Sequence, residues 1–167
     1  LEVESKAGWY VKPIDFDRLD QLYDLRVLLE LASVARLCAR ENDPPELEAL
    51  KAAWLVPAAE RLTEMREVGA LDEQFHATLV SAAGNAEIAK VHWDVTERIR
   101  IVRMQDFLTV DRIAQTVDQH LGILDPLIHG DLAEAEDRLV GHFDESLAIV
   151  EERTAVALTR MLGRGPR

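Results

Sequence analysis

Four side chains of the sequence, one aspartate and three histidines, have the types and spacing of a metal site. Asp72 and His76 are four residues apart in a segment with helical periodicity, so they lie on one helix face, one turn apart. His120 precedes a Gly-Asp pair at 130–131 by about ten residues, and His142 follows it by about eleven. A helical hairpin turning at that pair brings the two imidazoles to nearly the same height. Three imidazoles and a carboxylate suit Zn²⁺, Ni²⁺, Co²⁺ or Mn²⁺.

Each of these residues also has a structural explanation when it is taken singly. An acidic residue at a helix start, as at Asp72, is favoured by the helix dipole, and a histidine on an apolar face is more often a core residue than a ligand. We interpret His92 as a surface residue and His129 as a helix C-terminal residue, because neither is in register with the four. Glu73 precedes His76 in a Glu-x-x-His pattern, but di-iron bundles need two copies of it.

Two arginines and an asparagine are candidates for contact with a bound ligand. Arg26 lies within the leucine pattern of the first expected helix, and Arg98 lies on the apolar face of the fourth. An arginine that points inward needs an anion. For Arg26 this is either Glu30, one turn further along, or the carboxylate of a ligand. Asn85 is a helix N-cap on the simplest interpretation and a ligand contact on the alternative.

Apolar residues recur with a period of 3.6 over most of the chain, which predicts an all-α protein. Gly84 caps the third helix, Asn85 starts the fourth and Asp131 caps the sixth. Pro57 must kink or divide the second helix, and Pro126 interrupts the fifth. We expect an antiparallel bundle of about six helices, over residues 16–39, 45–68, 71–83, 85–102, 110–128 and 131–160.

The two ends of the chain differ from this helical pattern. Residues 1–12, LEVESKAGWYVK, alternate apolar and polar on both sides of a Lys-Ala-Gly turn, which is typical of a β-hairpin. A lone hairpin is marginal in water, so we expect it to be the end of a preceding domain, joined by a linker at Pro13. The predicted divisions are therefore a remnant and linker at 1–13, a helical domain at 14–160 and a flexible tail at 161–167.

Composition limits the setting in which the chain works. Aspartate and glutamate number 31 against 19 lysines and arginines, which gives a formal charge of −12. Phosphate binding needs local positive charge, so we do not expect these residues to bind nucleic acid by themselves. Cys38 is the only cysteine, so no internal disulfide can form and a cytoplasmic location is expected. No membrane span or signal peptide is visible in the sequence.

Three segments together resemble the FCD domain, the ligand-binding module of FadR-type GntR transcription regulators. The run LYDLRVLLELASVARLCA is similar to its opening helix, and LDEQFHATLVSAAGNAEI to its Asp-x-x-x-His segment followed by Gly-Asn. The run QHLGILDPLIHGDLAEAEDRLVGHF is similar to its closing His, Gly-Asp and His pattern. The resemblance covers about residues 16–155.

This resemblance implies both a site and a function. It implies that Asp72, His76, His120 and His142 are metal ligands, with zinc as the first expectation, and that Arg26 is the family's opening-helix arginine. In that family the bound metal helps to hold a small organic acid inside the bundle, which the resemblance implies for this chain as well. LEVESKAGWYV resembles the end of the wing of a winged helix-turn-helix domain, which implies DNA binding by a preceding domain of a homodimeric regulator.

From the sequence we therefore expect an effector-sensing domain and not an enzyme. It would bind a small carboxylate or hydroxyacid with the metal, Arg26, Arg98 and Asn85, and control operator binding by a dimer. Two rival hypotheses remain. One is a metal-dependent enzyme acting on a small carboxylate, although no general base stands beside the predicted metal. The other is a helical interaction module whose histidines are structural.

Overall fold

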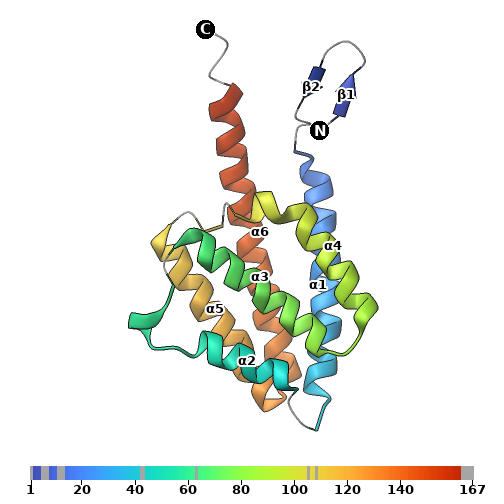
Figure 1. Cartoon of the computed structure of the whole chain (residues 1–167), viewed down its shortest axis with the longest axis vertical. Helices are drawn as coiled ribbons and strands as arrows, with labels where there is room; N and C mark the ends of the chain where they lie inside the picture. Colours follow the sequence, from blue (N-terminus) through green and yellow to red (C-terminus); the bar gives the residue numbers. More distant parts are fainter. Residues whose placement is uncertain are drawn as a thin grey trace.

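The computed structural model describes residues 2–4, 8–10, 14–41, 44–62, 64–104, 106–107 and 109–162. The predicted linker residue Pro13 and residues 163–167 of the predicted tail lie outside this part. Within it the chain forms two short strands, one 3-10 turn and six α-helices, as the periodicity predicted (Figure 1). The elements are β1 (Glu2–Glu4), β2 (Gly8–Tyr10), α1 (Phe16–Cys38), α2 (Pro45–Trp54), η1 (Ala58–Glu60), α3 (Met65–Ala82), α4 (Ala86–Arg103), α5 (Val110–His129) and α6 (Leu132–Leu162).

Local capping interactions explain where several helices begin and end. Asn85 caps α4, because its side-chain oxygen accepts hydrogen bonds from the backbone N–H groups of Glu87 and Ile88, both at 3.1 Å. Gly130 ends α5 in a left-handed conformation, with φ of 70°. The side chain of Asp131 then accepts from the backbone of Glu134 at 3.1 Å and starts α6. The α5–α6 hairpin therefore turns where the sequence predicted.

Proline has different effects at two positions. The predicted second helix is divided: α2 ends at Trp54, before Pro57, and α3 starts at Met65, six residues before its predicted start at Leu71. Pro126 does not interrupt α5, which was a wrong prediction, because the helix continues to His129. A proline removes one backbone hydrogen bond, and α5 ends three residues after this loss.

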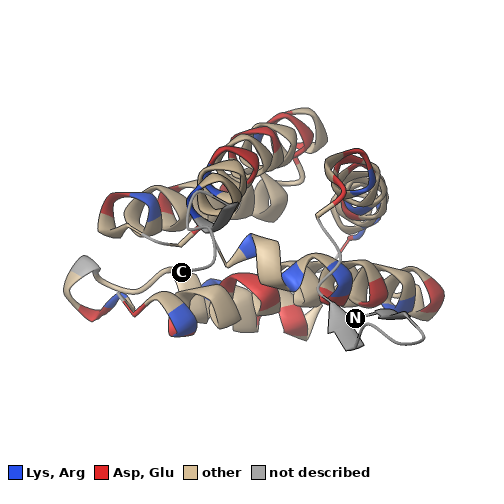
Figure 2. Ribbon diagram, turned by 90° about the horizontal axis from the view of Figure 1, so that it is seen from above, with Lys and Arg blue, Asp and Glu red and all other residues tan. Residues whose placement is uncertain are grey.

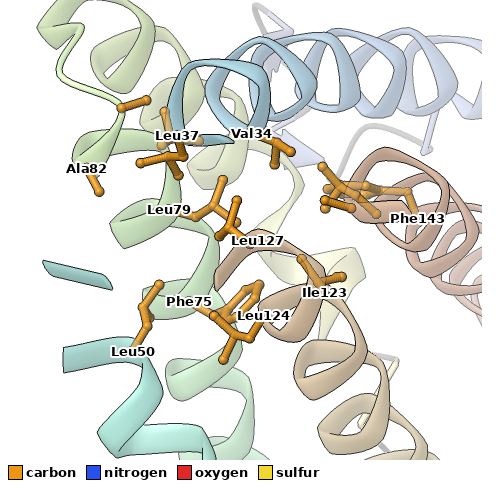
Figure 3. Packing of buried hydrophobic residues seen from close by; sticks show 14 of the residues in the cluster. Val34, Leu37, Leu50, Phe75, Leu79, Ala82, Ile123, Leu124, Leu127 and Phe143 are labelled. Atoms are coloured by element: carbon orange, nitrogen blue, oxygen red, sulfur yellow. The ribbon is translucent and has the colours of Figure 1, made fainter. Parts of the chain in front are cut away.

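The helices pack around a shared apolar core. α5 packs along α6, and α1 contacts α3, α4 and α6. Figure 3 shows Leu79 of α3 pointing toward Leu127 of α5, with Phe75 beside Leu124. In Figure 1 the C-terminal part of α6 extends beyond the other helices. This packing places the middle of α3, α5 and α6 inside the bundle.

The buried face of α1 differs from the predicted leucine pattern. Tyr23, Arg26 and Glu30 are buried, whereas Leu28 is 64% exposed and Leu25 is 37% exposed. The helix is rotated so that Arg26 and Glu30 face inward, where Glu30 contacts His76 of α3 and His92 of α4. This rotation brings polar groups from α1 to the centre of the bundle.

Figure 2 shows acidic and basic positions interspersed along the helices. β1 and β2 pair antiparallel, with Glu2 opposite Tyr10 and Glu4 opposite Gly8. Their assignment to a preceding domain stays a prediction. Among the helices of the described ranges, none is both long and apolar enough to cross a membrane.

Candidate metal centre

The four residues predicted as metal ligands come together inside the bundle. Asp72 and His76 come from α3, His120 from α5 and His142 from α6, and each is at most 4% exposed. One possible ligand atom from each residue lies within 4.8 Å of the other three. The four-residue spacing places Asp72 and His76 on one face of α3, and the turn at Gly130 brings His120 and His142 together. The four side chains therefore form a single cluster.

Contacts within the cluster identify the atoms that face one another. The Nε2 atoms of His76 and His142 are 3.3 Å apart. Oδ1 of Asp72 lies 3.3 Å from Nε2 of His120 and 3.6 Å from Nε2 of His76. Three imidazole nitrogens and one carboxylate oxygen thus surround a small volume, which is the donor set of a divalent transition metal.

Aromatic side chains hold His120 in place. Its ring stacks on Phe75, with centroids 4.1 Å apart and planes at 5°, and Trp54 meets it edge-on at 4.2 Å. Within the described part of the chain, neither ring nitrogen makes a hydrogen bond. Burial lowers the pKa of His120 to about 4, against the opposing effect of Asp72. The residue is therefore a neutral imidazole with unused nitrogens at pH 7, as a metal ligand must be.

His76 is oriented by a carboxylate from α1. Its Nδ1 lies 2.6 Å from Oε2 of Glu30, which is fully buried. Because an ionised carboxylate only accepts hydrogen bonds, Nδ1 carries the proton, and in the neutral imidazole Nε2 is then a lone pair. Burial by itself raises the pKa of Glu30. The charges of His76 and Arg26, and the hydrogen bonds from His76 and His92, have a larger and opposite effect. Together they hold the pKa of Glu30 well below its usual value.

Asp72 is oriented in a similar way by α4. The guanidinium of Arg103 donates a short hydrogen bond to Oδ2 of Asp72, which leaves Oδ1 on the side of the histidines. Burial raises the pKa of the Asp72 carboxyl, but the charge of Arg103 and the contacts of His120 and His76 hold it well below its usual value. The carboxylate is therefore ionised over the physiological range.

His142 completes the set from α6. Burial lowers its pKa well below the usual value, and the charges of His120 and His76 lower it further. Its Nδ1 lies 3.0 Å from Oε1 of Gln119. A surface groove of about 470 Å³ between α5 and α6 has His142 in its lining, whereas the other three residues of the cluster do not line it.

The three residues predicted to contact a ligand lie in different environments. Arg26 is 2% exposed and donates from Nε to Oε1 of Glu30 at 3.0 Å, while its Nη2 is buried without a partner in the described residues. Arg26 thus forms the salt bridge with Glu30 and keeps one buried donor for an anion contact. Arg98 is 41% exposed beside Asp94, and Asn85 is the N-cap of α4, so the structure does not bring either residue to the cluster.

The two histidines outside the cluster, His92 and His129, differ in their burial. His129 lies at the end of α5, exposed, with Nδ1 2.8 Å from the carbonyl oxygen of Asp125, as expected for a helix C-terminal residue. His92, predicted as a surface residue, is 1% exposed, and its Nε2 lies 2.8 Å from Oε1 of Glu30. The prediction for His92 was wrong because the buried face of α4 runs through His92, Thr96 and Arg103, whereas Val91 is exposed.

Sequence reasoning identified the four central residues but missed the groups that orient them. It treated Glu30 only as a partner of Arg26, and it assigned no role to Arg103. A charged residue within an apolar pattern was the available signal for Glu30. Arg103 gave no such signal, because its contact with Asp72 depends on how α4 packs against α3.

The fold agrees with comparisons to known proteins. The FCD domain family model matches residues 21–145, so the chain belongs to the FCD domain family. It is 30% identical over 166 residues to the Nta operon transcriptional regulator of Aminobacter aminovorans, covering 96% of this chain and 76% of that protein. It is 22% identical to the HTH-type transcriptional repressor GlaR of Escherichia coli K12, covering 93% of this chain and 74% of that one.

A solved structure shows the same fold. The metal-free FCD domain of TM0439 superposes with a TM-score of 0.70 at 19% identity, covering 87% of this chain and 99% of that one. With relatives that are transcription regulators, this chain is a regulatory, effector-sensing domain and not an enzyme. Its buried aspartate and three histidines form a cluster that could bind a metal ion.

Proposed function

We propose that residues 14–160 are the effector-sensing domain of a DNA-binding regulator of the FadR subgroup, and that they hold a divalent metal. The observation that carries this proposal is the convergence of Asp72, His76, His120 and His142, with ligand atoms within 4.8 Å of one another. Zinc is the first expectation, with nickel, cobalt and manganese as alternatives. The neutral, buried imidazoles of His120 and His142 and the ionised carboxylate of Asp72 support this assignment, since metal ligands must be deprotonated.

The proposed effector is a small carboxylate or hydroxyacid that contacts both the metal and Arg26. A divalent metal can accept oxygen ligands from such an acid when its protein ligands leave a position open. Arg26 supports the proposal because its Nη2 is a buried donor with no partner among the described residues. An unsatisfied buried donor costs about 1–3 kcal/mol, and a carboxylate oxygen would relieve that cost. Arg98 and Asn85 are not included, because they lie away from the cluster.

Control of DNA binding is proposed from the relatives, both of which carry the name of transcriptional regulators. DNA would be bound by a winged-helix domain that precedes this one, with residues 1–13 as the end of its wing and the linker. A homodimer is part of the same proposal, and the exposed Leu28 of α1 and Ile101 of α4, 64% and 84% exposed, are candidate contacts.

The first test is metal content of untagged protein, with thermal shifts across a panel of small organic acids on the same sample. We expect about one equivalent of a transition metal and stabilisation by one class of acid. Both should be lost in His142→Ala and kept in His129→Ala, a matched control, since His129 is 70% exposed. No metal in the wild type, or equal behaviour of the two variants, would defeat the proposal.

The rival interaction module with structural histidines makes the opposite prediction. His120→Ala and His142→Ala would then change stability but neither metal content nor ligand binding. The environment of His120 argues against this rival: Nδ1 has no partner among the described residues, and Nε2 faces Asp72 at 3.3 Å without a hydrogen bond of good geometry, whereas a structural histidine in a core normally has hydrogen-bond partners.

A further inference from the structure

One hydrogen bond decides which nitrogen of His142 carries the proton. Nδ1 of His142 lies 3.0 Å from a side-chain oxygen of Gln119, one residue before His120 on α5. A carbonyl oxygen accepts hydrogen bonds and cannot donate them, so Nδ1 must be the donor if Oε1 truly faces it. The position of the His142 proton therefore depends on the orientation of the Gln119 amide.

Charged neighbours on both sides fix that orientation. Nη1 of Arg112 donates to Oε1 of Gln119 at 3.0 Å, and Nε2 of Gln119 donates to Oε2 of Glu145 at 2.6 Å. Turning the amide over would place its NH₂ group against a guanidinium and its carbonyl against a carboxylate. Both contacts would be repulsive, so the amide has one favoured orientation.

Arg112 is itself held rigidly. It is 2% exposed and makes two hydrogen bonds to Asp106, from Nε at 2.7 Å and from Nη2 at 3.2 Å. Oδ2 of Asp106 also accepts from Oγ of Ser146 on α6, at 2.8 Å. A chain of polar contacts, buried at Asp106 and Arg112 and partly buried at Gln119, thus runs to His142.

We propose that Gln119 is a positioning residue, which keeps the proton of His142 on Nδ1 and presents Nε2 as a lone pair toward Nε2 of His76. The free imidazole ring has two tautomers, and the hydrogen bond at one nitrogen sets the state of the other. Glu30 does the same for the neutral form of His76. Two lone pairs then face each other across 3.3 Å, from α3 and α6, which is an arrangement suited to a shared cation.

The expected effect of Gln119 variants on metal affinity rests on the proposed function. The expected tautomer of His142 does not, because it follows from the hydrogen bond to Gln119 alone. Partners of this kind typically change metal affinity by 10–100-fold. We expect Gln119→Leu to weaken metal binding by about that factor. Gln119→Glu keeps an acceptor for His142 and Arg112, and Glu145, which is 62% exposed, can turn to solvent away from the new carboxylate, so this variant should stay within a few-fold of the wild type. Gln115→Leu, the same change one turn earlier on an exposed part of α5, should have no effect.

The decisive experiment is a long-range ¹H–¹⁵N correlation spectrum of chelator-treated, ¹⁵N-labelled protein at pH 7, together with metal dissociation constants for all four proteins. The proposal expects His142 with its proton on Nδ1 in the wild type, and a shift toward the Nε2–H tautomer in Gln119→Leu. A wild type with the proton on Nε2 would overturn it, without any need for a folded variant. So would an unchanged tautomer and unchanged affinity in Gln119→Leu.

The same data separate this inference from the proposed function. If the wild type binds no metal but shows the Nδ1–H tautomer, and Gln119→Leu loses it, Gln119 positions His142 and the metal hypothesis fails. If metal binds and the tautomer does not depend on Gln119, the proposed function stands and the positioning role is refuted.

Discussion

Replacing Glu30 by glutamine tests how much the charge at the centre of the bundle contributes to stability. Glu30 is fully buried and contacts Arg26 at 3.0 Å, His76 at 2.6 Å and His92 at 2.8 Å. Glutamine keeps the size of the side chain but removes its charge, so the buried guanidinium of Arg26 loses the carboxylate beside it. Breaking a buried ion pair in this way costs about 3–5 kcal/mol.

A surface pair on the same protein provides the matched control. Glu73 contacts Arg100 with two hydrogen bonds, at 2.7 and 2.9 Å, but the two side chains are 19% and 40% exposed. Glu73→Gln is therefore expected to cost only about 0–1 kcal/mol, since water screens the pair. At about 2–4 °C per kcal/mol, Glu30→Gln should lower Tm by about 6–20 °C, and Glu73→Gln by no more than about 4 °C.

The assay is urea denaturation followed by circular dichroism at pH 7, with a chelator present so that metal binding does not add to stability. Unfolding free energies of the wild type and the two variants are compared at equal m-values. If Glu30→Gln loses no more stability than Glu73→Gln, the buried charge is not a stabilising part of the bundle, and the reasoning on Glu30 is refuted.

Three further predictions follow from the same structure. Stability should fall as the pH drops from 6.5 to 4, because the unfolded chain takes up a proton at His120 that the folded one, with a pKa of about 4, does not. In urea titrations at each pH the loss should be smaller by about 3 kcal/mol in His120→Phe, and the loss that is left should come from His92 and His142, whose pKa values burial also lowers. Gly130→Ala should lower the unfolding free energy by about 1–2 kcal/mol, since φ is 70° at Gly130. Gly141→Ala should raise the unfolding free energy by about 0.5–1 kcal/mol, because a Cβ there meets open space within α6. Changes of the same sign in the two variants would contradict this prediction. Leu28→Glu should shift a dimer toward monomer in sedimentation velocity without loss of helix content, and an unchanged dimer would remove α1 from the interface.

The features predicted correctly from the sequence are those that depend on neighbouring residues along the chain. Asn85, Gly130 and Asp131 mark helix ends because caps act over two to four residues. The spacing of Asp72 and His76, and the symmetric distances from the α5–α6 turn, brought the candidate ligands together for the same reason.

The features missed depend on the rotation of whole helices. Leu25 and Leu28 are the more apolar choice for the inner face of α1, yet Arg26 and Glu30 are buried instead. Their burial is possible because α3 and α4 supply His76 and His92 as partners, which are 46 and 62 residues away from Glu30. No local pattern contains that information, and the wrong placement of His92 has the same origin.

The ligand cluster also joins distant parts of the chain. His76 and His142 are 66 residues apart in sequence and meet at 3.3 Å, while the lone Cys38 leaves the chain without an internal disulfide. A covalent cross-link closing a loop of that length would restrict the unfolded chain by about 4 kcal/mol at 25 °C. An ion shared by α3, α5 and α6 would act as a reversible cross-link of the same reach, so that metal supply could set the lifetime of the folded domain in the cell.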